Sequence, residues 1–518
     1  MATSAQVTGT WILVIAYMAV ILWFVVRGAL KTRSISDYAV GNIMFSPAVV
    51  ALSLAASMTS AATFVINPGF IANFGISGVI SYGIVLPLAS MISLAVLTKS
   101  FRAYGQSVKA LTLAQWIGDR YQSKAYALFM GFLALLLLTF IVLIAVAITQ
   151  VLSKALNADP VIVMVCVVVF IFGYMMFGGA NSMVYTNTIQ AAIMLVVAII
   201  LLTSGYEHFS QGIGRMMQKL TAIDPALTKP VNPASPLFRD YFEIIFAQIV
   251  VGVAIVVQPH IITKSLLLKR ESDVNRFLLI AIAAELLFFF VVVTGLYARL
   301  SFPDLKIDGV PMANDTIIPT YVTYVFSNGT VAVVVGLIVV LGLLSAGIST
   351  LEGLIQSVST TITSDIIKPL AGNRLKSDKA MITLNKVVIV LMAVVTIWLS
   401  YSQIKAPKLS VGIFAQNGVY AYFASAFVPV IFGIYYKKMK ARVAFTGTVI
   451  AFGVHFAVYY LMPYLVNSHG IRFGAFTKYL EGPVRNPAIA CAMAVVISTL
   501  TVLIMILVDR KTAKTTQA

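Results

Sequence analysis

Long runs of apolar residues recur from one end of the chain to the other. Each run is long enough to cross a hydrocarbon layer of roughly 30 Å as a helix, and the runs are continuous rather than alternating. Lipid offers the backbone no hydrogen-bond partners, so helices are the predicted form. The pattern predicts an all-α integral membrane protein. About thirteen candidate spans lie at 9–30, 45–67, 73–99, 123–153, 159–178, 184–206, 241–262, 275–300, 325–365, 380–403, 409–436, 441–465 and 486–508.

Composition and charge refine this picture. Hydrophobic residues make up 60% of the chain and charged residues only 10%, well below the ~25% of soluble domains. The net charge of +18 could suggest a nucleic-acid partner. However, with the N-terminus outside, most Lys and Arg fall in cytoplasmic segments, as the positive-inside bias requires. We therefore expect an N-out, C-in, multi-pass protein of the bacterial plasma (inner) membrane that does not bind nucleic acid.

One polytopic membrane domain is predicted over residues 1–518. Its core covers about 45–436, and peripheral helices lie at 9–30, 441–465 and 486–508. Cys166 and Cys491 fall inside apolar runs, which indicates neither a disulfide framework nor a metal cluster. No residues suggest a nucleophile–base pair, so enzyme activity is not expected. We also expect no obligate protein partner.

The span 45–67 has an unusual composition. It opens with Ser46-Pro47, its middle from Ser53 to Thr63 is rich in small and hydroxyl residues, and Asn67-Pro68-Gly69 is expected to end it. Such a segment can unwind and expose carbonyls at membrane depth, which is tolerated where the backbone lines a cavity or binds an ion. Tight helix packing is the alternative explanation, because small residues are common between membrane helices.

A second patch of small and hydroxyl residues lies within 325–365. Ala346, Ser349 and Thr350 share one helix face, since three or four residues make about one turn. A hard cation such as Na⁺ needs several oxygen ligands but no full negative charge. Hydroxyls here and carbonyls freed around Ala56–Thr59 would supply them.

These residues resemble the sodium/solute symporter family, which includes sodium/proline, sodium/pantothenate, sialic-acid and sodium/glucose symporters. The resemblance covers roughly residues 10–460. Four patches carry it: Ala56-Ser57-Met58-Thr59-Ser60; Phe177-Gly178-Gly179 with Tyr185-Thr186-Asn187-Thr188-Ile189-Gln190; Gln258-Pro259-His260-Ile261-Ile262 with Lys264; and Ala346-Gly347-Ile348-Ser349-Thr350 with Ser364-Asp365.

The resemblance implies an amino-acid-transporter-like core with an inverted five-helix repeat, and a substrate held near the midplane. Its sodium (Na⁺) site falls on the carbonyls of Ala56, Thr59 and Ala346 and on the hydroxyls of Ser349 and Thr350. Residues expected at the substrate cavity are Ser57, Ser60 and Thr63, with Tyr82, Gln258 and Gln416 as neighbours.

Two departures from the family pattern bear on coupling and substrate. Asn187 stands where several relatives have the Asp of a second sodium site, so one sodium ion per cycle is favoured. Met58 stands where the proline symporter has an Asp, which makes proline a less suitable substrate.

Glu285 and Glu352 lie within apolar runs, where a charge costs at least ~3 kcal/mol. Glu352 could be neutral, paired with a Lys, or involved with Asn187 in ion or proton coupling. We expect His260 to make a helix-end hydrogen bond, because Pro259 frees backbone carbonyls nearby.

The prediction for function is a sodium-coupled secondary active symporter that imports a small organic solute by alternating access. A carboxylate is favoured, either a monocarboxylate or a pantothenate-like acid, partly because Lys264 lies near the expected cavity. The alternatives are a sodium-coupled amino-acid symporter similar to the proline carriers, or a proton-coupled carrier. A channel would need a continuous polar pore, and a transport-fold sensor would need a signalling domain.

Overall fold

The computed structural model describes residues 2–40, 45–108, 111–262, 264, 268, 270–307, 309–372, 377–405 and 410–515. Helices dominate it, and one short antiparallel hairpin joins β1 (Lys306–Ile307) to β2 (Val310–Pro311). The predicted all-helical membrane class is confirmed. Within the described ranges, ten helical stretches are long and apolar enough to cross a membrane: Ser4–Ala29, Ile76–Ser100, Lys124–Leu156, Ala180–Thr203, Glu271–Ser301, Thr330–Ala371, Asp378–Lys405, Val411–Tyr435, Ala441–His469 and Pro487–Arg510.

Three further apolar stretches fall at the remaining expected spans. One is a helix pair bent by 53°, Pro47–Met58 with Ala62–Phe74, and the other two are the shorter helices Pro160–Met175 and Phe242–Ile255. The count of thirteen crossings, their orientation and the inverted repeat stay predictions.

The principal helices are α1 (Ser4–Ala29), α3 (Pro47–Met58), α4 (Asn67–Phe74), α6 (Leu86–Val108), α9 (Leu138–Leu156), α10 (Pro160–Met175), α11 (Ala180–Thr203), α14 (Gln248–Ile255), α16 (Val274–Phe290), α19 (Thr330–Thr361), α21 (Asp378–Lys405), α22 (Val411–Tyr435), α23 (Ala441–Phe456) and α25 (Pro487–Thr515).

Shorter helices complete the fold at the ends of these elements. They are α2 (Ile35–Val40), α5 (Ile76–Gly78), α7 (Leu113–Tyr121), α8 (Lys124–Leu133), α12 (Tyr206–Phe209), α13 (Ile213–Ile223), α15 (Pro259–Ile262), α17 (Thr294–Ser301), α18 (Ile317–Val325), α20 (Lys368–Ala371) and α24 (Met462–His469).

The expected end of the span 45–67 is wrong. Asn67, Pro68 and Gly69 form the first turn of α4, which continues to Phe74. Proline is tolerated in a first turn because the amide it lacks would have no helical partner there. The helix ends instead at Gly75, whose φ of +72° favours glycine and whose backbone lies against Leu227.

Helix α19 lies at the centre of the bundle and packs against α3, α9 and α11. Its close approach to α9 depends on Gly347, because a Cβ there would lie 2.4 Å from Cγ1 of Ile148. The expected span 325–365 began too early. α18 ends at Val325, and α19 begins only at Thr330, after Gly329 with its positive φ of +87°.

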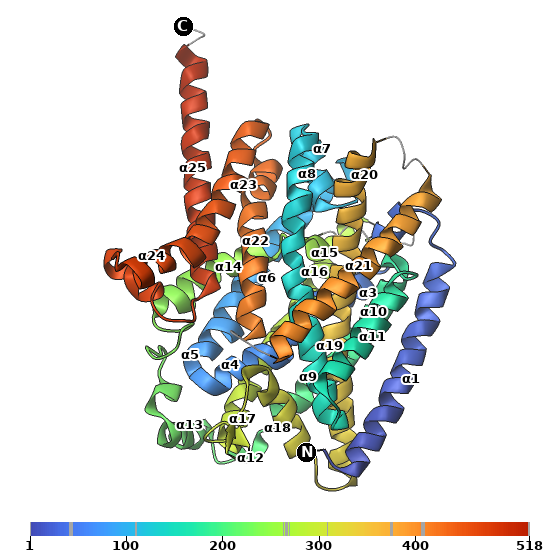
Figure 1. Ribbon diagram of the computed structural model, residues 1–518, viewed down its shortest axis with the longest axis vertical. Coiled ribbons are helices and arrows are strands. Elements are labelled where there is room, and N and C mark those ends of the chain that lie inside the picture. Colours follow the sequence, from blue (N-terminus) through green and yellow to red (C-terminus); the bar gives the residue numbers. More distant parts are fainter. Residues whose placement is uncertain are drawn as a thin grey trace.

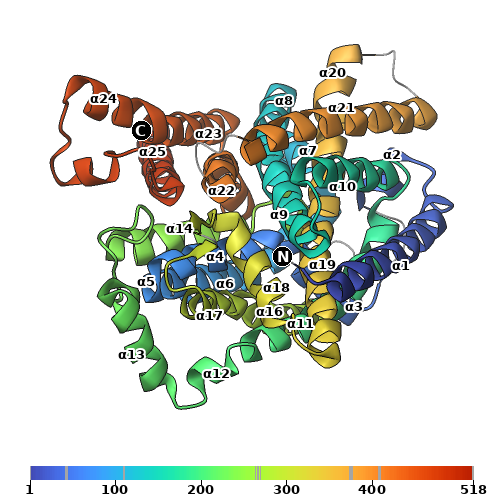
Figure 2. The same cartoon turned by 60° about the horizontal axis from the view of Figure 1, so that its bottom comes forward.

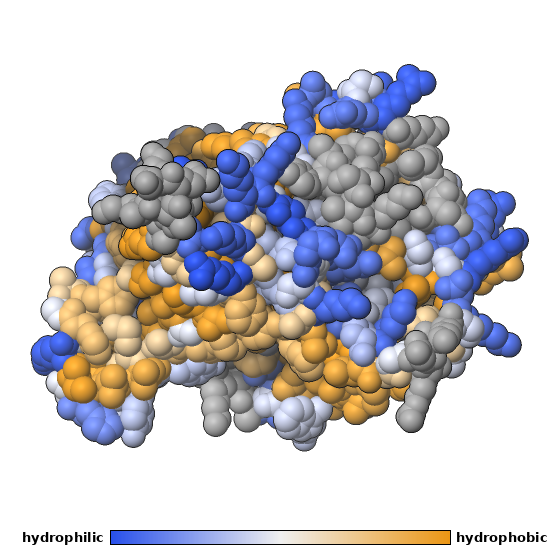
Figure 3. Space-filling model, turned by 90° about the horizontal axis from the view of Figure 1, so that it is seen from above, coloured by the Kyte–Doolittle hydropathy of each residue, from blue (hydrophilic) through white to orange (hydrophobic). Residues whose placement is uncertain are grey.

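Peripheral helices flank this centre. α1 lies on one flank, and α23 and α25 lie on the opposite flank, in both ribbon views (Figures 1 and 2). The N-terminus and the C-terminus lie at opposite ends of the molecule (Figure 1). Hydrophilic residues are spread over the end from which α25 projects (Figure 3), whereas many large apolar side chains on α1 and α25 remain exposed. Exposed apolar flanks are the surface that a membrane requires.

Candidate functional site

The bent helix pair places a break in the middle of the bundle. α3 ends at Met58, Thr59 has an extended backbone with φ −94° and ψ 110°, and a π-helical turn begins at Ala62. Because the chain leaves the helix there, carbonyls of the last turn lose the amide partners that a continuing helix would provide. The carbonyls of Ala56 and Thr59 are thereby available to other groups.

Two hydroxyls on α19 face these carbonyls. The Ser349 hydroxyl donates to the carbonyl oxygen of Ala56 at 2.6 Å and lies 3.2 Å from that of Ala346. The Thr350 hydroxyl lies 3.4 Å from the carbonyl oxygen of Thr59 and 3.3 Å from that of Ala346. All five residues are at most 1% exposed. The structure therefore brings together the five oxygens that the sequence resemblance assigned to sodium.

The chemistry of this donor set suits a hard monovalent cation. Hard cations prefer oxygen ligands, and unwound carbonyls at membrane depth coordinate Na⁺ in transporters with broken helices. The five oxygens are neutral, so the groups in direct contact with a bound cation would be dipoles. Soft metals would instead favour thiolate or imidazole ligands.

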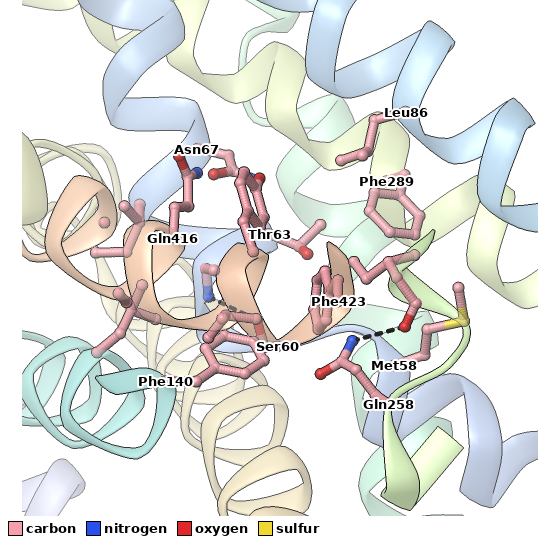
Figure 4. A pocket seen from close by; sticks show the side chains of 18 of the residues that line it. Met58, Ser60, Thr63, Asn67, Leu86, Phe140, Gln258, Phe289, Gln416 and Phe423 are labelled. Carbon is pink, nitrogen blue, oxygen red and sulfur yellow. Dashed lines mark hydrogen bonds between the residues drawn. The ribbon is translucent and has the colours of Figure 1, made fainter. Parts of the chain in front are cut away.

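A pocket of about 70 Å³ lies beside the break (Figure 4). Ser60 and Thr63 reach it from the chain after the break, Gln258 from the segment between α14 and α15, and Gln416 from α22. These are four of the six residues expected at the substrate cavity. Apolar walls, which the sequence did not predict, come from Met58, Leu86, Phe140, Phe289, Tyr420 and Phe423, and Asn67 adds another amide.

One polar atom of the pocket has an unmet hydrogen bond. The Gln258 amide nitrogen donates to the carbonyl oxygen of Ile255 at 3.1 Å, which fixes the orientation of the amide. Its buried oxygen Oε1 then has no partner among the described residues. A molecule in the pocket could meet this acceptor with an N–H or O–H donor.

His260 also lines the pocket, and its expected helix-end hydrogen bond is wrong. Neither ring nitrogen has a partner in the described part of the chain. The ring instead packs against α19, because a Cβ on Gly353 would lie 3.5 Å from the ring carbon Cδ2 of His260.

Ser57, Tyr82 and Lys264 do not line the pocket. The Ser57 hydroxyl faces Asn187 at 2.9 Å. The Tyr82 hydroxyl accepts a hydrogen bond from the Gln416 amide at 3.4 Å. Tyr82 is therefore connected to the pocket through Gln416 and does not line it. The Lys264 ammonium donates to the Ser53 hydroxyl at 2.8 Å, so it makes no direct contact with a solute in this pocket.

A sequence profile of the sodium:solute symporter family matches residues 38–451. The chain belongs to the sodium:solute symporter family. It is therefore a sodium-coupled solute symporter of the inner membrane, as the motifs indicated, and its relatives are transporters.

Relatives of this symporter differ in the solutes that their names give. The sodium/pantothenate symporter of Haemophilus influenzae is 26% identical over 449 residues, which cover 85% of this chain and 88% of the relative. The sodium/pantothenate symporter of Escherichia coli is 24% identical over 462 residues, covering 86% and 89%. The high-affinity proline transporter of Bacillus subtilis is 22% identical over 434 residues, covering 81% and 86%.

Solved structures show the same fold. An outward-open, substrate-bound sodium-coupled sialic acid symporter superposes with a TM-score of 0.73 at 16% identity, covering 96% of this chain and 98% of the other. MhsT in complex with L-phenylalanine gives a TM-score of 0.53 at 14% identity, covering 90% and 99%.

Glu285 is placed at the break in this symporter. Its carboxylate oxygen Oε2 accepts a hydrogen bond from the Thr59 hydroxyl at 2.6 Å, and the side chain is fully buried on α16. Thr59 thus offers its carbonyl toward α19 and its hydroxyl toward α16. Glu285 was recognised in the sequence only as a buried acid, because residues 226 positions apart give no local signal of their contact.

Glu352 and Asn187 lie together beside Ser57 of α3. The Glu352 carboxylate accepts from the hydroxyls of Tyr174 and Thr186, and the Asn187 amide lies between Glu352 and Ser57. Both residues are buried. Glu352 and Asn187 therefore lie next to the five-oxygen cluster but contribute no oxygen to it.

Proposed function

We propose that this symporter imports a small organic carboxylate together with one sodium ion by alternating access. The convergence of five buried oxygens from the end of α3 and from α19, beside a pocket of about 70 Å³, carries this proposal. A cation bound there would hold the two helices together. It would drive transport only by binding one conformation more tightly than the other.

The electrostatics of the pocket support a carboxylate. Ser60, Ala62 and Thr63 line it at the start of the helical segment that follows the break. The N-terminal end of a helix carries unpaired amides and a partial positive charge, and half-helices of transporters use this end to bind anionic groups. A neighbouring sodium ion would add to this attraction.

The rest of the pocket supports a carboxylate with an apolar body and at least one hydrogen-bond donor. The aromatic side chains of Phe140, Phe289 and Phe423 would contact the apolar body, and Oε1 of Gln258 would accept from the donor. A hydroxy- and amide-bearing acid such as pantothenate fits this description better than a simple monocarboxylate. The pantothenate symporters among the relatives agree with this choice.

An amino acid such as proline is the second candidate, because its ammonium group would also supply a donor to Gln258 and proline transporters are among the relatives. Met58 lines the pocket and carries no charge to match that ammonium group. We therefore place proline second.

Uptake by proteoliposomes tests the proposal. Labelled pantothenate, lactate and proline are offered under an inward sodium gradient and under an equal choline gradient. We expect sodium-dependent accumulation that is greatest for pantothenate. Equal uptake in sodium and choline would remove the coupling mechanism, and accumulation of proline alone would replace the carboxylate with the amino acid.

A further inference from the structure

A lysine and a glutamate are buried side by side in this symporter without a direct ion pair. Lys264 is 6% exposed and Glu352 is 1% exposed, and both lie within hydrogen-bond distance of the Asn187 amide. Leaving either charge uncompensated at this depth would cost several kcal/mol. The pair therefore needs a connection between the two charges.

The Asn187 amide supplies this connection. Its surroundings fit one orientation, in which the amide oxygen faces the Lys264 ammonium at 3.3 Å and the Ser57 hydroxyl at 2.9 Å. The amide nitrogen then donates to the Glu352 carboxylate at 3.1 Å and to the Gln190 amide oxygen at 2.9 Å. A neutral amide can bridge a cation and an anion in this way because it carries both a donor and an acceptor.

This bridged pair contacts both helices that form the oxygen cluster. Lys264 bonds Ser53 on α3, three residues before Ala56. Glu352 follows Thr350 by two positions on α19. Ser57 joins the two groups of residues, because its hydroxyl contacts Asn187 and its carbonyl oxygen accepts from the Thr350 hydroxyl at 3.3 Å.

We propose that Lys264 and Glu352, bridged by Asn187, act as a resident ion pair that sets the sodium affinity of the oxygen cluster, a role that rests on the sodium site proposed above. The ammonium repels a second cation, and the carboxylate offsets that repulsion. With both charges present the neutral cluster binds sodium at intermediate strength. Since the bridge places a fixed ammonium beside Asn187, the pair also favours one sodium ion per cycle.

The two charges act with opposite sign, which gives a sharp test. A full charge about one helical turn away changes cation binding by roughly tenfold or more, even at an effective dielectric constant near ~20. Lys264→Met should therefore lower the sodium concentration for half-saturation about tenfold, and Glu352→Gln should raise it about tenfold. The double variant should return close to the wild-type value.

Thermal unfolding of the purified full chain is measured with sodium chloride titrated against choline chloride. A bound cation stabilises the folded state by an amount that grows with the logarithm of its concentration divided by Kd. Lys379→Met, which replaces an exposed lysine on α21, is the matched control and should leave the sodium response unchanged.

If Glu352→Gln does not fold, Lys264→Met alone decides, because misfolding cannot produce tighter binding. The ion-pair role would be overturned if the two single variants shifted the sodium half-saturation in the same direction or not at all. It would also be overturned if the double variant did not return close to the wild-type value. A wild-type chain that does not respond to sodium would instead overturn the proposed function.

Discussion

Two helices of this symporter are interrupted at the pocket, and the two interruptions present different atoms. After Met58, α3 gives way to Thr59–Ala61, and backbone carbonyls turn toward the hydroxyls of α19. Between α14 and α15, residues 256–258 leave the helix before Pro259, and the side chain of Gln258 reaches the pocket. The first interruption thus offers neutral oxygens to a cation, whereas the second offers one amide oxygen to a solute.

Under the proposed function, we expect this difference to separate ion coupling from solute recognition. Backbone carbonyls are kept when side chains change. They therefore suit the binding of a cation that many relatives share. A side-chain amide changes with a single substitution, which suits a solute that differs between relatives. Removal of the α19 hydroxyls that face the first interruption should therefore affect sodium dependence, and changes of Gln258 should affect solute affinity.

Removal of the α19 hydroxyls should have the largest effect. Ser349→Ala and Thr350→Ala each delete a ligand oxygen, and interactions with a charged partner contribute about 1.5–3 kcal/mol, or roughly tenfold to a hundredfold in sodium half-saturation. Sodium-activated uptake measures the change. Ser345→Ala is the control, because its hydroxyl lies 3.2 Å from that of Tyr17, outside the cluster. A wild-type sodium response in both variants would remove the site.

Gln258→Leu should have an intermediate effect, confined to the solute. Loss of one neutral hydrogen bond contributes about 0.5–1.5 kcal/mol, so the KM for the solute should rise roughly two- to tenfold. Sodium half-saturation at saturating solute should stay constant. Gln248→Leu is a matched control. Gln248 is also buried, at the start of α14, and its Oε1 also has no hydrogen-bond partner among the described residues, but it lies outside the pocket. A change in sodium half-saturation alone would contradict the separation.

Glu285→Leu should have the smallest effect on transport. The variant leaves the Thr59 hydroxyl without its acceptor, which costs about 1–3 kcal/mol of stability but removes no ligand oxygen. We expect a lower unfolding temperature and a sodium half-saturation raised only about threefold, or less than 1 kcal/mol. Glu285→Gln should restore both, since an amide oxygen also accepts. An equal defect in both variants would mean that the charge of Glu285 matters, rather than its hydrogen bond.

Much of the architecture could be predicted because its cause is local. Apolar length predicted the helices. The run of small and hydroxyl residues was compatible with a break near Thr59 but also with tight helix packing. Helix ends were less predictable. Asn67-Pro68-Gly69 is typical of a helix end but begins α4 here, because proline suits a first turn as well as a terminus.

The site could be predicted only in part because much of it is assembled from distant residues. Spacing on one helix grouped Ser349 with Thr350, and the family resemblance paired them with Ala56. Neither kind of signal could place Lys264 beside Asn187 or move Ser57 out of the pocket, since these contacts depend on how α3, α11 and the segment after α15 pack together. The sequence also could not predict the aromatic walls of the pocket. A phenylalanine in an apolar span can face a pocket, the core or lipid, and the sequence does not distinguish these positions.

The short contact from the Ser349 hydroxyl to the Ala56 carbonyl has a consequence for ion release. A hydroxyl that binds a cation must offer its lone pair and turn its hydrogen away, so an arriving ion has to compete with this hydrogen for the same carbonyl. When the ion departs, the hydrogen returns and the two helices regain an attraction to each other. If sodium binds as proposed, this hydrogen bond would replace the lost ion contact and so lower the free-energy cost of emptying the site in every cycle.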